Sequence, residues 1–172
     1  MGKGHKSIEE SLVIKAQEVV GRFTPFVVSE RELHKIDKTD KTNNHPSDLG
    51  DYDVLAFLEA KNILLYIECK VIDPPYCLKD ARRLREKIFG RIKKDGSFQG
   101  EYLQKVERRA EYLSAHSEEV MAALTWGSRH NQPRVISVFL TQLGFWWTKF
   151  PPVETNIRFV QIKMLEAFVS TL

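Results

Sequence analysis

The spacing of apolar residues predicts helices near both ends of the chain and in its middle. From Ser7 to about Gly21, apolar side chains recur mostly every three or four positions, which is typical of a helix with one buried face. The same spacing recurs from Ala81 to about Gly96 and from Glu101 to Leu124. A short closing helix is expected over Met164–Leu172.

Shorter runs rich in Val, Ile, Leu and Phe predict the strands. They are expected over Phe26–Ile36, Val54–Leu58, Ile63–Ile67, Arg134–Thr141 and Ile157–Ile162. The segment Lys35–Asp48 is rich in Asn, Asp and Lys, which predicts a loop. This order of elements favours an α/β fold in which a mixed central sheet is flanked by helices on both faces. We expect residues 1–172 to form one domain, either alone or within a larger protein.

The second and third strands are expected to form a hairpin, because only the polar segment Glu59–Asn62 separates them. With a symmetric loop, Asp53 lies opposite Glu68 and Asp51 lies opposite Lys70. Directly opposed residues have Cα atoms roughly 4.5 to 5.5 Å apart, so the first pair of carboxylates can converge on one point.

Alternation along the strands then assigns the remaining hairpin residues to two faces. The charged face also carries Leu55, Phe57, Leu64 and Tyr66. The opposite face carries Tyr52, Val54, Ala56, Leu58, Ile63, Leu65, Ile67 and Cys69. A slip of one residue would bring acids into this second, apolar face, which supports the register. The large apolar residues beside the acids predict that the charges are at least partly buried.

Two carboxylates this close destabilise a fold unless one takes a proton or a cation lies between them. Mg²⁺ prefers oxygen ligands and is commonly held by one or two carboxylates together with water and phosphate oxygens, and Mn²⁺ can substitute for it. We therefore expect Asp53 and Glu68 to bind a divalent metal. Lys70 is placed to orient a water molecule or to neutralise charge on a phosphate.

The segments GDYDVLAF and LLYIECK, which carry Asp53 and the triplet Glu68-Cys69-Lys70, resemble the PD-(D/E)XK nuclease superfamily. The resemblance covers most of the chain and implies a restriction-endonuclease-like fold. It implies that Mg²⁺ is held by Asp53, Glu68 and the carbonyl of Cys69, while Lys70 assists the water that cleaves a phosphodiester of DNA. Tyr52 stands where the superfamily has Pro.

Other site residues follow from the same resemblance. Many members carry an acid on the first helix, for which Glu10 and Glu18 are candidates here, with Glu10 preferred. The segment YLQKVERRAEYL, with Lys105 and Arg109 one helical turn apart, resembles the helix that follows the motif in some relatives. Asp51 offers a second acid beside Asp53, so the choice between them depends on the register.

Charge is distributed unevenly in this chain, whose net charge of +3 is small for its 172 residues. Between Lys79 and Asp95, eight basic residues face three acidic ones. Two explanations of this run are open. Arg82, Arg83 and their neighbours could contact nucleic-acid phosphates, or they could form a merely solvated helix face. Lys105 and Arg109 are further candidates for contact with phosphate, in competition with ion pairs along their own helix.

These patterns favour a metal-dependent nuclease with DNA as the preferred substrate. A homodimer would supply two sites for cleavage of both strands. The alternative is a catalytically inactive nucleic-acid-binding or assembly module that retains the fold. Two cysteines are too few for a disulfide framework, and no apolar run reaches the length of a membrane span or resembles a signal peptide. We therefore expect a cytoplasmic, nucleoid or nuclear protein.

Overall fold

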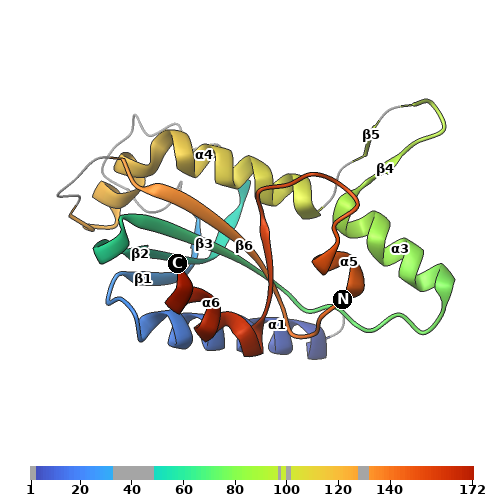
Figure 1. Ribbon diagram of the computed structural model, residues 1–172, viewed down its shortest axis with the longest axis horizontal. Coiled ribbons are helices and arrows are strands. Elements are labelled where there is room, and N and C mark those ends of the chain that lie inside the picture. Colours follow the sequence, from blue (N-terminus) through green and yellow to red (C-terminus); the bar gives the residue numbers. More distant parts are fainter. Residues whose placement is uncertain (1–2, 33–48, 97, 100–101, 128–131) are drawn as a thin grey trace.

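The computed structural model describes residues 3–32, 49–96, 98–99, 102–127 and 132–172 (Figure 1). Its centre is a five-stranded mixed sheet in the order β1-β2-β3-β6-β7. The strands are β1 (Val27–Glu32), β2 (Asp51–Leu58), β3 (Ile63–Lys70), β6 (Arg134–Thr141) and β7 (Arg158–Gln161). β1, β2 and β3 are antiparallel, whereas β6 runs parallel to both β3 and β7. The expected α/β class and mixed sheet are confirmed.

Helices cover both faces of this sheet, as expected (Figure 1). One face packs against α1 (Lys3–Gly21) and α6 (Leu165–Thr171), and the other packs against α3 (Leu78–Phe89) and α4 (Tyr102–Ala123). A short helix, α5 (Trp146–Lys149), lies between β6 and β7. Beyond the end of α3, the small hairpin of β4 (Arg91–Ile92) and β5 (Phe98–Gln99) projects from the body of the protein (Figure 1).

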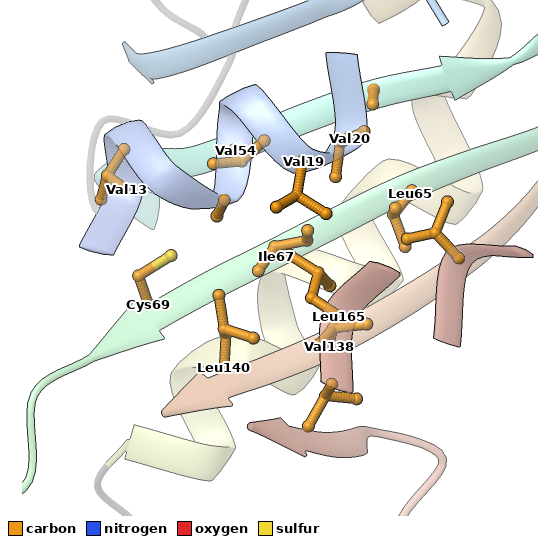
Figure 2. Close-up of a cluster of buried hydrophobic side chains, with 14 of the residues drawn as sticks. Val13, Val19, Val20, Val54, Leu65, Ile67, Cys69, Val138, Leu140 and Leu165 are labelled. Atoms are coloured by element: carbon orange, nitrogen blue, oxygen red, sulfur yellow. The ribbon is translucent and has the colours of Figure 1, made fainter. Parts of the chain in front are cut away.

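The face beneath α1 and α6 is apolar from end to end (Figure 2). Val54 and Ile67 contribute to it from the hairpin, and Val19 and Leu165 contribute from the two helices. Cys69 is fully buried at its edge, as predicted, and burial raises the pKa of its thiol. This thiol is a packing group in its neutral form.

The opposite face is also buried, although it carries the charged residues. Leu55, Phe57, Leu64 and Tyr66 lie in one hydrophobic cluster with side chains of α3 and α4. These are the residues that the hairpin register places beside the acids. The predicted burial of this face is therefore confirmed.

The hairpin register is confirmed from the pair Val54–Ile67 to the pair Leu58–Ile63. The pairing of β2 with β3 ends there, so the predicted pairs Asp53–Glu68 and Asp51–Lys70 are not formed. On its other edge, β2 pairs with β1 as far as Asp51, which lies opposite Glu32. Strict alternation also fails at Tyr52, which lies in the cluster of Tyr66, with their ring centres 5.0 Å apart.

The cause of this failure is a local irregularity of β1 and β2. Alternation breaks between Tyr52 and Val54, and on the neighbouring strand the regular pairing skips Glu30, whose φ is +49°. The register of β1 with β2 is the same on both sides of the skipped position, so neither strand gains a residue. The pairing of β2 with β3 ends at the same point, before Asp53.

Several element boundaries differ from the sequence pattern. β2 begins at Asp51 and β3 ends at Lys70, so each hairpin strand is three residues longer than expected. α1 begins at Lys3, before the expected start at Ser7. The helix expected to reach Gly96 ends at Phe89, because Gly90 has a φ of +83° and the chain then enters the β4–β5 hairpin, which periodicity did not predict. The expected continuation of the first strand to Ile36 and the loop Lys35–Asp48 lie outside the described residues.

Candidate active site

Glu68 is the most deeply buried charged residue of the site, with a side chain only 7% exposed on β3. Its Oε1 atom lies 3.1 Å from Nζ of Lys70. Its Oε2 atom accepts a hydrogen bond of 2.7 Å from the hydroxyl of Tyr66 and a second one from Nη1 of Arg109. A carboxylate in the interior is stable only when its lone pairs and its charge are satisfied in this way.

Asp53 approaches the same point from β2. Its Oδ2 atom accepts a hydrogen bond of 2.7 Å from the backbone N–H of Cys69 and lies 3.8 Å from Nζ of Lys70. This reach across to β3 is possible because the two strands no longer pair at this position. The structure thus brings together Asp53, Glu68 and Lys70, the residues selected from the sequence, although not through the expected opposed pair.

Asp53 is the acid whose charge is least compensated. Burial and, after it, the negative charge of Glu68 raise the pKa of Asp53 to about 7. The positive charge of Lys70, the hydrogen bond from Cys69 and the positive charge of Arg109 lower this pKa but do not offset the increase. At neutral pH the site therefore has room for either a proton or an additional cation.

Lys70 lies between three carboxylates. Besides Glu68 and Asp53, its Nζ atom is 3.2 Å from Oε1 of Glu9. Burial alone would lower the pKa of this lysine, but the surrounding carboxylates outweigh burial and raise it. Lys70 is therefore a permanent cation at neutral pH, which suits it to stabilising negative charge and excludes it as a base that removes a proton from water.

The first helix contributes Glu9 to the site, whereas the sequence pattern favoured Glu10. Glu10 and Glu18 are both exposed on α1. Neighbouring helical residues point about 100° apart, so only one of two adjacent acids can face the sheet. Glu9 continues the stripe of buried residues Leu12, Val13, Ala16 and Val20 at helical spacing. Ile8 and Ile14, which follow the apolar spacing in the sequence, are 53% and 56% exposed and do not belong to this buried face.

Arg109 belongs to the carboxylate site and not to an open surface. Its side chain is 12% exposed, and its Nε atom donates a hydrogen bond of 2.6 Å to the backbone oxygen of Leu49. Gly50, with a φ of +69°, passes so close that an added Cβ atom would lie 3.0 Å from Nη2 of Arg109. Lys105, one turn earlier on α4, is exposed.

Tyr66 is a site residue that sequence reasoning treated only as part of the core. Besides its bond to Glu68, its hydroxyl accepts a hydrogen bond of 3.2 Å from Nη1 of Arg109. Burial raises the pKa of Tyr66, which remains a neutral donor to the carboxylate. The signal for this role was present in the sequence: Tyr66 is two residues from Glu68 on one strand and therefore on the same face.

A cleft of about 410 Å³ leads from the solvent to this site. Lys70 and Glu9 line it together with Lys87 and Tyr102. The Nζ atoms of Lys70 and Lys87 lie 5.9 Å and 5.1 Å from the centre of the Tyr102 ring. The remaining lining residues are Val71, Ile72, Asp73, Pro74, Pro75, Tyr76, Asp80 and Leu84.

The other basic candidates lie on the exposed side of α3, beyond this cleft. Nε of Arg82 is 2.9 Å from Oε1 of Glu86, and Nη1 of Arg83 is 4.0 Å from Oδ1 of Asp80. These pairs lie on a solvated helix face, which the sequence left open as the alternative to phosphate binding. Exposed pairs of this kind contribute little to stability, so a phosphate can displace them.

The donors present fit a magnesium ion held by few protein ligands. Within the described ranges, no cluster of three or more His, Cys, Asp or Glu side chains is arranged to hold a metal. Asp53 and Glu68 supply two carboxylates, and Asp53 lies against the peptide of Cys69. Mg²⁺ keeps several waters and is commonly held by one or two carboxylates plus substrate phosphates. The excess negative charge at Asp53 is the structural feature that favours such an ion.

Comparison with known proteins identifies no relative, so the function of this protein is inferred from the geometry of the site. No family model, curated protein or solved structure matches the chain significantly. Within the part of the chain that the structure describes, none of the helices has both the length and the apolar character needed to cross a membrane.

The first prediction concerns the proton at Asp53. Because its pKa is about 7 in the folded protein and about 3.9 in an unfolded chain, the folded state binds this proton more tightly. The contribution of Asp53 to the free energy of unfolding therefore falls as the pH rises from about 4 to 7. We expect Asp53→Asn to stabilise the metal-free protein at pH 8 by roughly 1 to 3 kcal/mol, and by less at pH 5. Urea denaturation measures both values, and an equal effect at the two pH values contradicts the assignment.

The second prediction concerns the cation that holds Glu68. Arg109→Gln removes one partner of a buried ion pair, which we expect to lower the free energy of unfolding by about 3 to 5 kcal/mol. Lys105→Gln, which removes an exposed charge from the same helix, serves as the matched control and should cost less than about 0.5 kcal/mol. Adding Glu68→Gln to Arg109→Gln should recover part of the loss. A purely additive double variant would show that the two residues are not coupled.

Proposed function

We propose that this protein is a metal-dependent nuclease that hydrolyses phosphodiester bonds, with DNA as its preferred substrate. The observation that carries the proposal is the meeting of Asp53, Glu68 and Lys70 at one end of a cleft that Lys87 also lines. The order of α1, the antiparallel strands β1 to β3 and the helical connection to parallel β6 is consistent with a restriction-endonuclease-like fold.

The carboxylates of Asp53 and Glu68, with the carbonyl oxygen of Cys69, would hold Mg²⁺ or Mn²⁺. When bound, the ion supplies Lewis-acid stabilisation of the phosphate and makes a bound water more acidic. Ionised Asp53 is the form that can ligate a metal, and its pKa of about 7 means that uptake of the ion displaces a proton below neutral pH.

Lys70 acts as a fixed positive charge during the reaction. Its Nζ atom would orient the attacking water and neutralise the charge that develops on the phosphate as the bond to the leaving oxygen breaks. Glu9 and Glu68, at 3.2 Å and 3.1 Å, keep the lysine both charged and in place. Arg109 and Tyr66 act through Glu68, which they hold in one orientation.

A second candidate function is a nucleic-acid-binding or assembly module without turnover. The contacts of Glu68 favour it, since both of its carboxylate oxygens already have cationic partners in Lys70 and Arg109. A protein that no longer needed a metal could keep the carboxylates neutralised in this way. The count of charges argues against this alternative, because three carboxylates, those of Glu9, Asp53 and Glu68, meet at the site and the two cations Lys70 and Arg109 balance two of them.

The third prediction tests turnover. With Mg²⁺ or Mn²⁺, we expect the protein to nick supercoiled plasmid, and Asp53→Ala and Lys70→Ala to lower the rate by roughly 100-fold or more. Lys163→Ala, an exposed charge on the turn after β7, is the control that should retain full activity. Linear product formed without a nicked intermediate would indicate paired sites, as in a homodimer. Plasmid that is retarded but never cut by the folded protein would favour the binding module.

The fourth prediction tests the metal without requiring activity. Calorimetry at pH 6.5 in two buffers of different ionisation enthalpy should show uptake of Mg²⁺ or Mn²⁺ with release of a proton. Asp53→Asn should abolish this release, whereas Glu118→Gln, which alters an exposed acid of α4, should leave it unchanged. Metal uptake without a proton, or without dependence on Asp53, would show that the ion binds elsewhere.

A further inference from the structure

A second basic hollow lies beside the cleft, where α3 ends and the β4–β5 hairpin begins. Arg83, Lys87 and Arg91 line it together with Glu86, and its volume is about 290 Å³. Arg83 and Lys87 lie one turn apart on α3, and Arg91 opens β4 just after the turn at Gly90. Three cations are thereby directed into one hollow from two elements.

The carboxylate that lines this hollow already has a cationic partner. Oε1 of Glu86 is held by Nε of Arg82 at 2.9 Å, so this carboxylate is partly neutralised by an arginine that does not itself line the hollow. Lys93 and Lys94, in the turn of the hairpin, are exposed and add to the positive surroundings. An anion entering the hollow therefore meets an excess of positive charge.

Arg91 is positioned more firmly than an ordinary surface arginine. Its Nε and Nη2 atoms donate hydrogen bonds of 3.3 Å and 3.2 Å to Oε1 of Gln99 on the paired strand. The hairpin turn is closed by a bond of 3.0 Å from the N–H of Gly96 to the oxygen of Lys93. Figure 1 shows this hairpin extending beyond the end of α3. Orientation by Gln99 lowers the entropy lost when the guanidinium binds a ligand.

Lys87 connects this hollow with the cleft of the candidate active site, since it lines both. The Nζ atoms of Lys87 and Lys70 both lie near the ring of Tyr102, at 5.1 Å and 5.9 Å from the ring centre. A chain of regularly spaced anions can therefore contact Lys70 and Lys87 together and continue to Arg91. The backbone of a nucleic acid has this character.

We propose that Arg83, Lys87 and Arg91 form a second phosphate-binding site, which holds the backbone of double-stranded DNA next to the phosphodiester at Lys70. The inference rests on the proposed nuclease function and deepens it. Contacts of this kind set the position of the strand without reading its sequence, because they touch phosphate and not base edges. The guanidinium groups match the geometry of phosphate oxygens, and Lys87 adds a point charge between the two sites.

The test measures binding alone. Fluorescence anisotropy of a labelled DNA duplex in EDTA, over a series of KCl concentrations, gives the slope of log affinity against log salt. For Lys87→Ala/Arg91→Ala we expect this slope to fall by about 1.8, since each phosphate contact on duplex DNA contributes about 0.9. The control Lys15→Ala/Lys163→Ala removes the same charge from exposed positions on α1 and the turn before α6, and its slope should not change.

A second variant separates position from charge. Gln99→Leu keeps every cation but releases Arg91, and it should weaken binding with a fall in slope of no more than about 0.9. Equal effects in the hollow and control variants, or no binding of duplex DNA by the parent protein, overturn the inference. If Lys87→Ala/Arg91→Ala weakens the binding of duplex RNA but not that of duplex DNA, the assignment to DNA is wrong. Thermal unfolding of each variant shows that the fold is retained.

Failure of this inference and failure of the nuclease proposal give different results. If the hollow variants lose binding and the parent protein does not cleave plasmid in Mg²⁺ or Mn²⁺, the phosphate site is supported and the nuclease proposal is wrong. If the parent protein cleaves plasmid and the hollow variants bind and cut like the Lys15→Ala/Lys163→Ala control, the nuclease proposal is supported and the phosphate site is wrong.

Discussion

The buried carboxylate of Glu68 is the constraint on which the arrangement of this protein depends. A charge in the interior must be compensated, and the two cations that compensate it come from different parts of the fold. Lys70 links it to Glu9 on α1, whereas Arg109 brings in α4 and, through the oxygen of Leu49, the segment before β2. One charge on a central strand therefore connects the helical layers on both faces of the sheet, and the precise placement of each layer depends on it.

Compensation at Glu68 leaves Asp53 as the reactive member of the pair. Lys70 lies closer to Glu68, at 3.1 Å, than to Asp53, at 3.8 Å, and Arg109 bonds only to the former among the two acids. Burial and, after it, the negative charge of Glu68 raise the pKa of Asp53 to about 7, and the two cations lower this pKa too little to offset the increase. In the proposed nuclease, the carboxylate of Glu68 would fix the geometry of the site, and the less compensated carboxylate of Asp53 would bind the magnesium ion.

Local periodicity predicted the sheet, the helices on its two faces and the residues Asp53, Glu68 and Lys70, because each of these depends on which side of an element a residue lies. It could not predict contacts made by folding distant segments together, such as that between Arg109 and Glu68. It also failed where the backbone departs from regularity, as at Tyr52. Glu9 could have been found from the sequence, since it shares the helical spacing of Leu12, Val13 and Ala16, which are buried against the sheet.

The distribution of charge around the site also favours one path for the proposed nucleic-acid substrate. A cavity of about 960 Å³ on the other side of α4 is bordered by Glu107, Glu111 and Glu154, which would repel a phosphate chain. The cleft at Lys70 continues instead toward Lys87 and the basic end of α3. The net charge of +3 conceals this separation of acidic and basic surfaces. In the proposed complex, a strand at Lys70 would therefore run along α3 toward the β4–β5 hairpin and away from the acidic side of α4.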